Sequence, residues 1–171
     1  MSQKEDLKGL SGWLILVGIG VVLSPIRFVT MYYPFFIRIL NDGTWEILTT
    51  PGKEAYHPLW APLLASEMFY ISAMVLVSLY LVYLYFSKHY LFPKVYIAIV
   101  AASLIFIPLD AGFLTLVLPD RPLFDSASAK EFARALVSGM IWVPYMLISK
   151  RVRATFVENS PKKLKHLDGT N

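Results

Sequence analysis

Four charged side chains stand inside long apolar stretches of this chain, and their types could support chemistry within a membrane. They are Arg27, Glu67, Asp110 and Arg134. A charged residue at membrane depth is energetically costly, so it usually faces the protein interior, pairs with another group, or serves a ligand or an ion. Two of the four are acidic and two are basic. If they converge, they form a cluster without net charge, in which pairing lowers the cost of burial.

The four charges lie at similar depths if the apolar stretches are helices. At a rise of about 1.5 Å per residue, each lies roughly 24 to 32 Å from one and the same face of the membrane. They would therefore share the outer third of the bilayer. We expect at least one acid-base pair, and we favour Asp110 with Arg27 or Arg134, because these three are closest in depth.

Two interpretations of these charges stay open on sequence alone. In the first, Glu67 and Asp110 exchange protons or bind a cationic group against the two arginines. In the second, the cluster only holds helices together, or the long side chains of Arg27 and Arg134 extend to the lipid headgroups.

Prolines accompany two of the charges. Pro25 and Pro108 each stand two residues before a charge, Arg27 and Asp110 respectively, and Pro144 lies in the last apolar stretch. A proline in a helix interior frees a carbonyl group and bends the helix. We therefore predict helix kinks at these three prolines, two of them beside charges.

The apolar stretches themselves predict an all-α integral membrane protein, a bundle of four transmembrane helices. The chain is 56% hydrophobic and only 16% charged, whereas a soluble domain has about 25% charged residues. Each stretch reaches the roughly 20 residues that a helix needs to cross the hydrocarbon core. The expected spans are 10–31, 61–86, 95–118 and 130–148.

The distribution of basic residues predicts that both termini are cytoplasmic, because lysine and arginine near span ends tend to stay on that side. Lys4, Lys8, Lys88 and Lys94 lie on that predicted side, and acidic residues dominate the other, namely Asp42, Glu46, Glu54, Asp120, Asp125 and Glu131. A cluster of basic residues follows the last span and would be drawn to anionic headgroups: Lys150, Arg151, Arg153, Lys162, Lys163 and Lys165.

The chain is expected to form one membrane domain over residues 1–157, followed by a basic cytoplasmic tail over 158–171. Within the outer segment 34–60, two apolar and aromatic runs flank Asn41, Asp42 and Gly43. An Asp-Gly turn between such runs is typical of a β-hairpin. We therefore predict a short outer hairpin, with a helix end and an interfacial loop as the alternative.

Motifs of soluble enzymes and of metal sites are missing from the sequence. The chain has no cysteine, and its three histidines fall in separate segments, so neither thiol chemistry nor a metal or cofactor site is expected. Phosphate-binding loops and hydrolase motifs are also absent. The basic charge belongs at the membrane surface, and nothing else in the sequence favours nucleic-acid binding.

Several segments resemble a bacterial membrane family called domain of unknown function 2569. The resemblance is most specific for the run from Ile141 to Phe156, and it also includes Gly9 to Leu14, Ser24 to Ile26, and Ser66 to Met68. It covers nearly the whole chain, from about Gly9 to Val157. What it implies is a bacterial inner-membrane protein with four helices, and it brings no activity with it.

The function expected from these observations is that of a small non-enzymatic membrane protein that acts through binding. It would serve as an accessory or interaction protein for membrane lipids or for another membrane protein. The alternative is a transporter or channel-like protein for protons or small solutes, which would use the four charges. The sequence predicts no ligand, partner or oligomeric state.

Overall fold

The structure is a computed structural model that describes residues 9–157, and this part of the chain consists of helices and the turns between them. Four helices are long and two are short. Their bounds are α2 (Trp13–Asn41), α3 (Thr44–Thr49), α4 (Trp60–Phe86), α5 (Phe92–Val117), α6 (Ser126–Ile148) and α7 (Lys150–Thr155).

The four long helices confirm the predicted spans, since each is long and apolar enough to cross a membrane. The protein is therefore a multi-pass membrane protein. The bounds differ most for α2, which we expected to end at Met31 but which continues to Asn41. Its 29 residues correspond to roughly 43 Å of helix, more than the hydrocarbon thickness of about 30 Å. One end of α2 therefore projects beyond the hydrocarbon or the helix is tilted.

The predicted β-hairpin is wrong, because residues on both sides of Asp42 and Gly43 are helical and no strand occurs within 9–157. Gly43 has φ of 80°, the left-handed conformation that ends a helix and that glycine adopts without strain. Asp42 Oδ1 accepts a hydrogen bond from the Thr44 amide at 2.9 Å. Asp-Gly thus forms a helix-to-helix turn, and the same dipeptide is favoured in hairpins for the same conformational reason.

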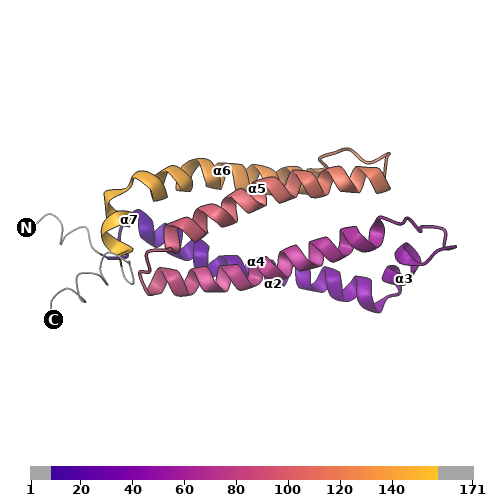
Figure 1. Cartoon of the computed structure of the whole chain (residues 1–171), viewed down its shortest axis with the longest axis horizontal. Helices are drawn as coiled ribbons and strands as arrows, with labels where there is room; N and C mark the ends of the chain where they lie inside the picture. Colours follow the sequence, from indigo (N-terminus) through magenta and orange to yellow (C-terminus); the bar gives the residue numbers. More distant parts are fainter. Residues whose placement is uncertain (1–8, 158–171) are drawn as a thin grey trace, which may run out of the picture.

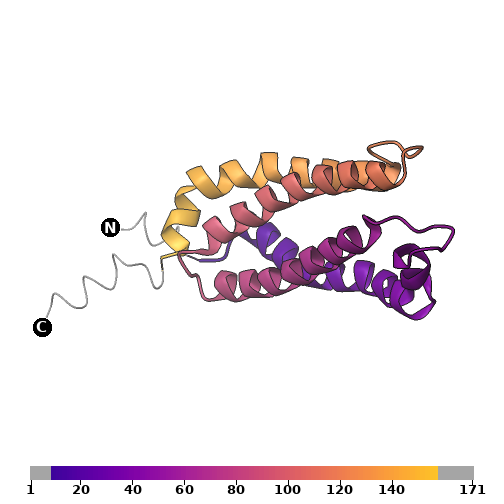
Figure 2. The same ribbon diagram turned by 45° about the vertical axis from the view of Figure 1, so that its right-hand side comes forward.

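The long helices form two antiparallel pairs, α2 with α4 and α5 with α6, and α4 also packs against α5. In both views the pairs approach each other at the end that carries α7 and spread apart toward the end that carries α3 (Figures 1 and 2). We call these the closed end and the open end. Gly9 and Val157, the limits of the described chain, both belong to the closed end, since each is hydrogen-bonded to Thr155 of α7.

The main core of the protein lies at the closed end and combines residues from five helices. Phe92 and Phe156 stack with ring centroids 4.4 Å apart, and Tyr85 meets Phe92 edge-on at 5.3 Å. The buried cluster comprises Leu14, Val17, Val21, Leu81, Leu84, Tyr85, Phe92, Met146, Val152 and Phe156. Helix α7 therefore folds back under the bundle and closes it.

Hydrogen bonds tie the beginning of the described chain to α7. The buried Thr155 hydroxyl accepts from the Gly9 amide and donates to the Gly9 carbonyl, both at 3.2 Å. The Arg151 guanidinium donates to the Ser11 hydroxyl. The two ends of the membrane domain thus stabilise each other directly.

A close approach between α2 and α4 occurs at Gly18. The buried Tyr85 hydroxyl donates a hydrogen bond to the Leu14 carbonyl at 2.7 Å, and its ring lies over Gly18. A Cβ atom at Gly18 would lie 2.5 Å from the Tyr85 hydroxyl oxygen. Glycine is therefore required there for the contact between the two helices.

We predict that Gly18→Ala lowers the stability of the protein by about 1 to 3 kcal/mol, the usual cost of overpacking a core. Gly20→Ala is the matched control, because a Cβ at Gly20 meets no atom within 4 Å. Thermal unfolding in detergent, followed by circular dichroism, measures both variants. Equal melting temperatures for the two variants would contradict the role assigned to Gly18.

Candidate functional site

A cavity of about 430 Å³ lies between the two helix pairs and is lined by α2, α4, α5 and α6. We call it the interhelix cavity. Its part nearer the closed end is mostly apolar, with Leu16, Val21, Leu81, Ile99 and Trp142 among its walls. Toward the open end the lining becomes polar, and we call these residues the polar rim: Arg27, Tyr32, Tyr70, Ser103, Glu131 and Arg134.

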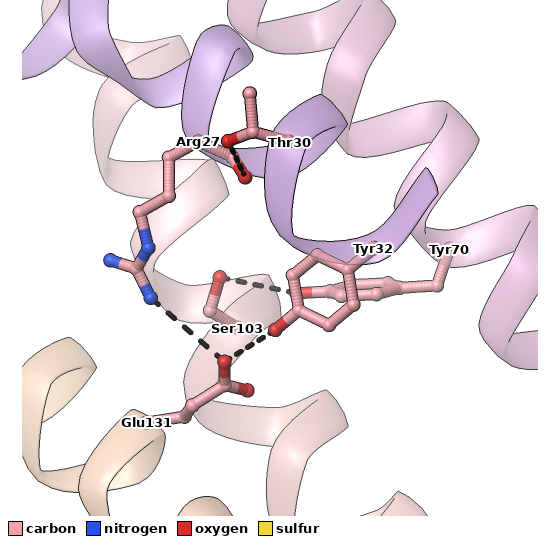
Figure 3. A network of polar contacts seen from close by, with 6 residues as sticks. All are labelled: Arg27, Thr30, Tyr32, Tyr70, Ser103 and Glu131. Carbon is pink, nitrogen blue, oxygen red and sulfur yellow. Dashed lines mark hydrogen bonds and ion pairs between the residues drawn. The ribbon is translucent and has the colours of Figure 1, made fainter. Parts of the chain in front are cut away.

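Glu131 on α6 is the centre of the polar rim and links the two helix pairs. Its Oε1 accepts a hydrogen bond from the Tyr32 hydroxyl at 2.5 Å and lies 3.9 Å from Nη2 of Arg27. Figure 3 shows both α2 side chains directed at this one carboxylate. The Arg27 side chain is 46% exposed and that of Glu131 27%. The carboxylate therefore accepts one hydrogen bond and forms one ion pair across the gap between α2 and α6.

A second polar link joins α4 to α5. The Tyr70 hydroxyl donates to the Ser103 hydroxyl at 3.1 Å, which in turn donates to the Ile99 carbonyl at 3.1 Å (Figure 3). The Tyr70 ring stacks on Phe106 with centroids 3.6 Å apart. All four long helices thus contribute a polar side chain to the wall of the cavity.

The four predicted site residues fall into two groups rather than one. Arg27 and Arg134 line the interhelix cavity, whereas Glu67 and Asp110 do not. The carboxyl groups of Glu67 and Asp110 instead lie close enough to interact with each other between α4 and α5. Asp110 Oδ1 is buried without a hydrogen-bond partner in the described residues.

The favoured pairing of Asp110 with Arg27 or Arg134 is not present among residues 9–157, where Arg27 pairs with Glu131 instead. Depth along a helix axis was the basis for that pairing. It does not fix direction around the axis, and α4 lies between α2 and α5 in the packing order. The Asp110 carboxyl group therefore lies near that of Glu67 on α4.

Glu131, Tyr32, Tyr70 and Ser103 were missed as site residues by the sequence analysis, which counted Glu131 among the outer acidic residues, at the first turn of the expected span 130–148. Asp125 carried the missing signal, because its carboxylate accepts the Ser128 amide at 2.8 Å as an N-cap of α6. This bond and the Arg121 guanidinium lower the pKa of Asp125 to about 2. With α6 starting at Ser126, Glu131 lies in the second turn of the helix rather than at its end, and it stands three residues from Arg134, on the same face.

The predicted kink positions all lie inside long helices, Pro25 in α2, Pro108 in α5 and Pro144 in α6. Pro34 adds a second interior proline to α2. Prolines inside membrane helices are tolerated because neighbouring groups satisfy the freed carbonyls. The predicted bends at these positions stay predictions.

Three of the six residues predicted to bind lipid headgroups lie within the described part of the chain. Lys150, Arg151 and Arg153 belong to α7, where Arg151 binds Ser11 and Arg153 donates to the Leu147 carbonyl at 2.7 Å. Their positions at the closed end leave Lys150 exposed beside the last span. The other three lie outside the described residues, and they are Lys162, Lys163 and Lys165.

The chemistry that this arrangement offers is that of binding an anion or a polar headgroup. Guanidinium and phenol groups donate hydrogen bonds, and arginine matches carboxylate or phosphate oxygens two at a time. Within residues 9–157, no three histidine, aspartate or glutamate side chains gather as a metal site would require.

Glu131 is predicted to matter to the stability of the open end. Glu131→Ala removes the acceptor of Tyr32 and the partner of Arg27, and we expect a loss of about 1 to 3 kcal/mol in stability. Because an orphaned charge is worse than no pair, Arg27→Gln combined with Glu131→Ala should recover part of that loss. A double-mutant cycle from thermal unfolding tests this, and strictly additive effects would contradict the pair.

A family model described as "Protein of unknown function (DUF2569)" matches residues 7–157. No curated protein and no solved structure matches the chain.

Proposed function

Because the chain belongs to the DUF2569 family, whose description assigns no activity, we propose a function from the cavity itself. The protein is a small non-enzymatic binding protein of the bacterial inner membrane. It serves as an accessory or interaction protein, holding a small amphipathic molecule or a lipid between its two helix pairs for another membrane component.

The observation that carries this proposal is the interhelix cavity. Its volume of about 430 Å³ lies within the roughly 300 to 1,000 Å³ typical of small-molecule sites. Such sites combine mostly apolar walls with a few polar groups that fix orientation. The interhelix cavity has this composition, with the charged groups in the polar rim and a few hydroxyl groups, such as those of Ser78, Tyr96 and Ser138, among the apolar walls.

Small side chains in the cavity wall support the proposal that a ligand occupies the cavity. Gly20, Ser24, Ala135 and Ser138 all line it, and a Cβ at Gly20 would meet no atom within 4 Å. Small residues on membrane helices commonly permit close packing. At Gly20 the small residue leaves space instead.

We predict that the purified protein retains a bound small molecule or lipid, detectable as an added mass in native mass spectrometry. Gly20→Phe should fill the cavity and remove that mass from the folded protein. Gly112→Phe is the matched control, because Gly112 also lacks neighbours within 4 Å but does not line the cavity. A protein without added mass, or an unchanged mass in Gly20→Phe, would refute binding in the cavity.

The proposed orientation places the closed end and both termini in the cytoplasm. The basic residues of α7 and Lys88 and Lys94, in the connection and first turn between α4 and α5, lie at this end, as expected for a cytoplasmic surface.

Single cysteines test the orientation, since the chain has none of its own. In intact cells an impermeant thiol reagent should label a cysteine at Gly43 and should leave cysteines at Ser2 and Asn171 unlabelled until the membrane is permeabilised. Labelling at either terminus in intact cells would reverse the orientation.

A second candidate function is proton-coupled transport, and the Glu67–Asp110 contact favours it. Two adjacent carboxyl groups inside a membrane domain cannot both ionise without strong repulsion, so they can share and release a proton. Proton flux into proteoliposomes that Glu67→Gln abolishes would favour this candidate over binding alone.

A further inference from the structure

We propose that the ligand of the interhelix cavity is an anionic lipid drawn from the membrane leaflet on the open side. Its headgroup binds Arg134 and Arg27, and its acyl chain occupies the apolar part of the cavity. This inference rests on the proposed binding function and names the class of molecule that the cavity takes.

The net charge of the polar rim favours an anionic ligand. The cavity is lined by two guanidinium groups and one carboxylate, Arg27, Arg134 and Glu131, which leaves one excess positive charge. Glu131 is already engaged by Arg27 and Tyr32. Arg134 makes no ion pair or hydrogen bond within residues 9–157. A headgroup phosphate would supply the missing counter-charge and match the planar guanidinium with two hydrogen bonds.

The direction of the cavity fits a lipid rather than a free anion. The polar rim faces the open end. Below it the cavity extends for about three helical turns, from Arg27 to Leu16 on α2 and from Glu131 to Trp142 on α6, along walls that are mostly apolar and carry no charged side chain. A lipid of the open-side leaflet has the same orientation, with its headgroup toward that surface and its acyl chain toward the membrane centre. It can therefore enter without turning over, and the apolar part gains contacts that inorganic phosphate cannot provide.

The gap between α2 and α6 offers the entrance. Close packing joins α2 to α4, α4 to α5 and α5 to α6, so the cavity is closed on these sides by helix contacts. Across the remaining side, the rim links α2 and α6 through Glu131 alone, with the Arg27 contact at 3.9 Å. An incoming phosphate can replace the Glu131 carboxylate at Arg27, because both are anionic acceptors for the same donor.

Native mass spectrometry with defined lipids tests the proposal. The full-length protein is delipidated and mixed with equal amounts of phosphatidylglycerol and phosphatidylcholine that carry identical acyl chains. The wild type should retain phosphatidylglycerol in preference. Arg134→Gln should reduce that preference about tenfold, in line with the loss of a charge-assisted hydrogen bond, and Arg134→Lys should restore part of it.

Arg38→Gln serves as the matched control, because Arg38 lies on α2 near the open end but does not line the cavity. It should leave the lipid preference unchanged. Thermal unfolding of each variant verifies folding, and the Arg134→Lys variant keeps the test valid if Arg134→Gln unfolds. Equal retention of the two lipids by the wild type, or the same loss in Arg38→Gln as in Arg134→Gln, would overturn the proposal.

Inorganic phosphate distinguishes the source of the anion. In large excess it should leave phosphatidylglycerol bound, and displacement of the lipid would show a site for free anions and refute the lipid. A protein that retains both lipids equally, and loses both in Gly20→Phe, would refute the anionic class while the proposed binding function stands. A protein that retains neither lipid, and that carried no added mass before delipidation, would refute both.

Discussion

The hydrogen bond from the Tyr85 hydroxyl to the Leu14 carbonyl is the contact on which the rest of the structure depends. It holds α4 against α2 at Gly18, where no side chain separates the helices. Around it, Phe92 and Phe156 attach α5 and α7 to the same buried cluster. Because this end is fixed by polar and aromatic contacts together, the other ends of the helix pairs can diverge without loss of the core.

Divergence at the open end makes room for the cavity, and individual glycines either permit close packing or leave space. At Gly18 the Tyr85 ring contacts the backbone of α2. At Gly139 on α6, an added Cβ atom would lie 3.1 Å from Cγ1 of Val100 on α5. Gly20, only two residues beyond Gly18, faces empty space. Gly18 and Gly20, about 200° apart around the axis of α2, thus allow close packing on one face and leave space on the opposite face.

The spans could be predicted from sequence because hydropathy over about 20 residues reports the lipid environment directly. The route of the chain beyond Met31 could not, since an Asp-Gly turn satisfies a helix end as well as a hairpin. The pairing of charges failed for a related reason. Depth follows from residue number, but the direction of Asp110 or Glu131 around its helix depends on how the helices pack. Asp125 as an N-cap was a local signal that α6 starts at Ser126, and it would have placed Glu131 inside the helix rather than at its first turn.

The contacts of α7 impose an order on biogenesis. Chains are made from the N-terminus, so α2, α4 and α5 can enter the membrane before Val152, Thr155 and Phe156 exist. Until those residues leave the ribosome, Gly9 lacks the Thr155 hydroxyl and Phe92 lacks its stacking partner. Helix α7 follows all four spans in the chain, so its contacts with Gly9 and Phe92 can form only after every span has been synthesised.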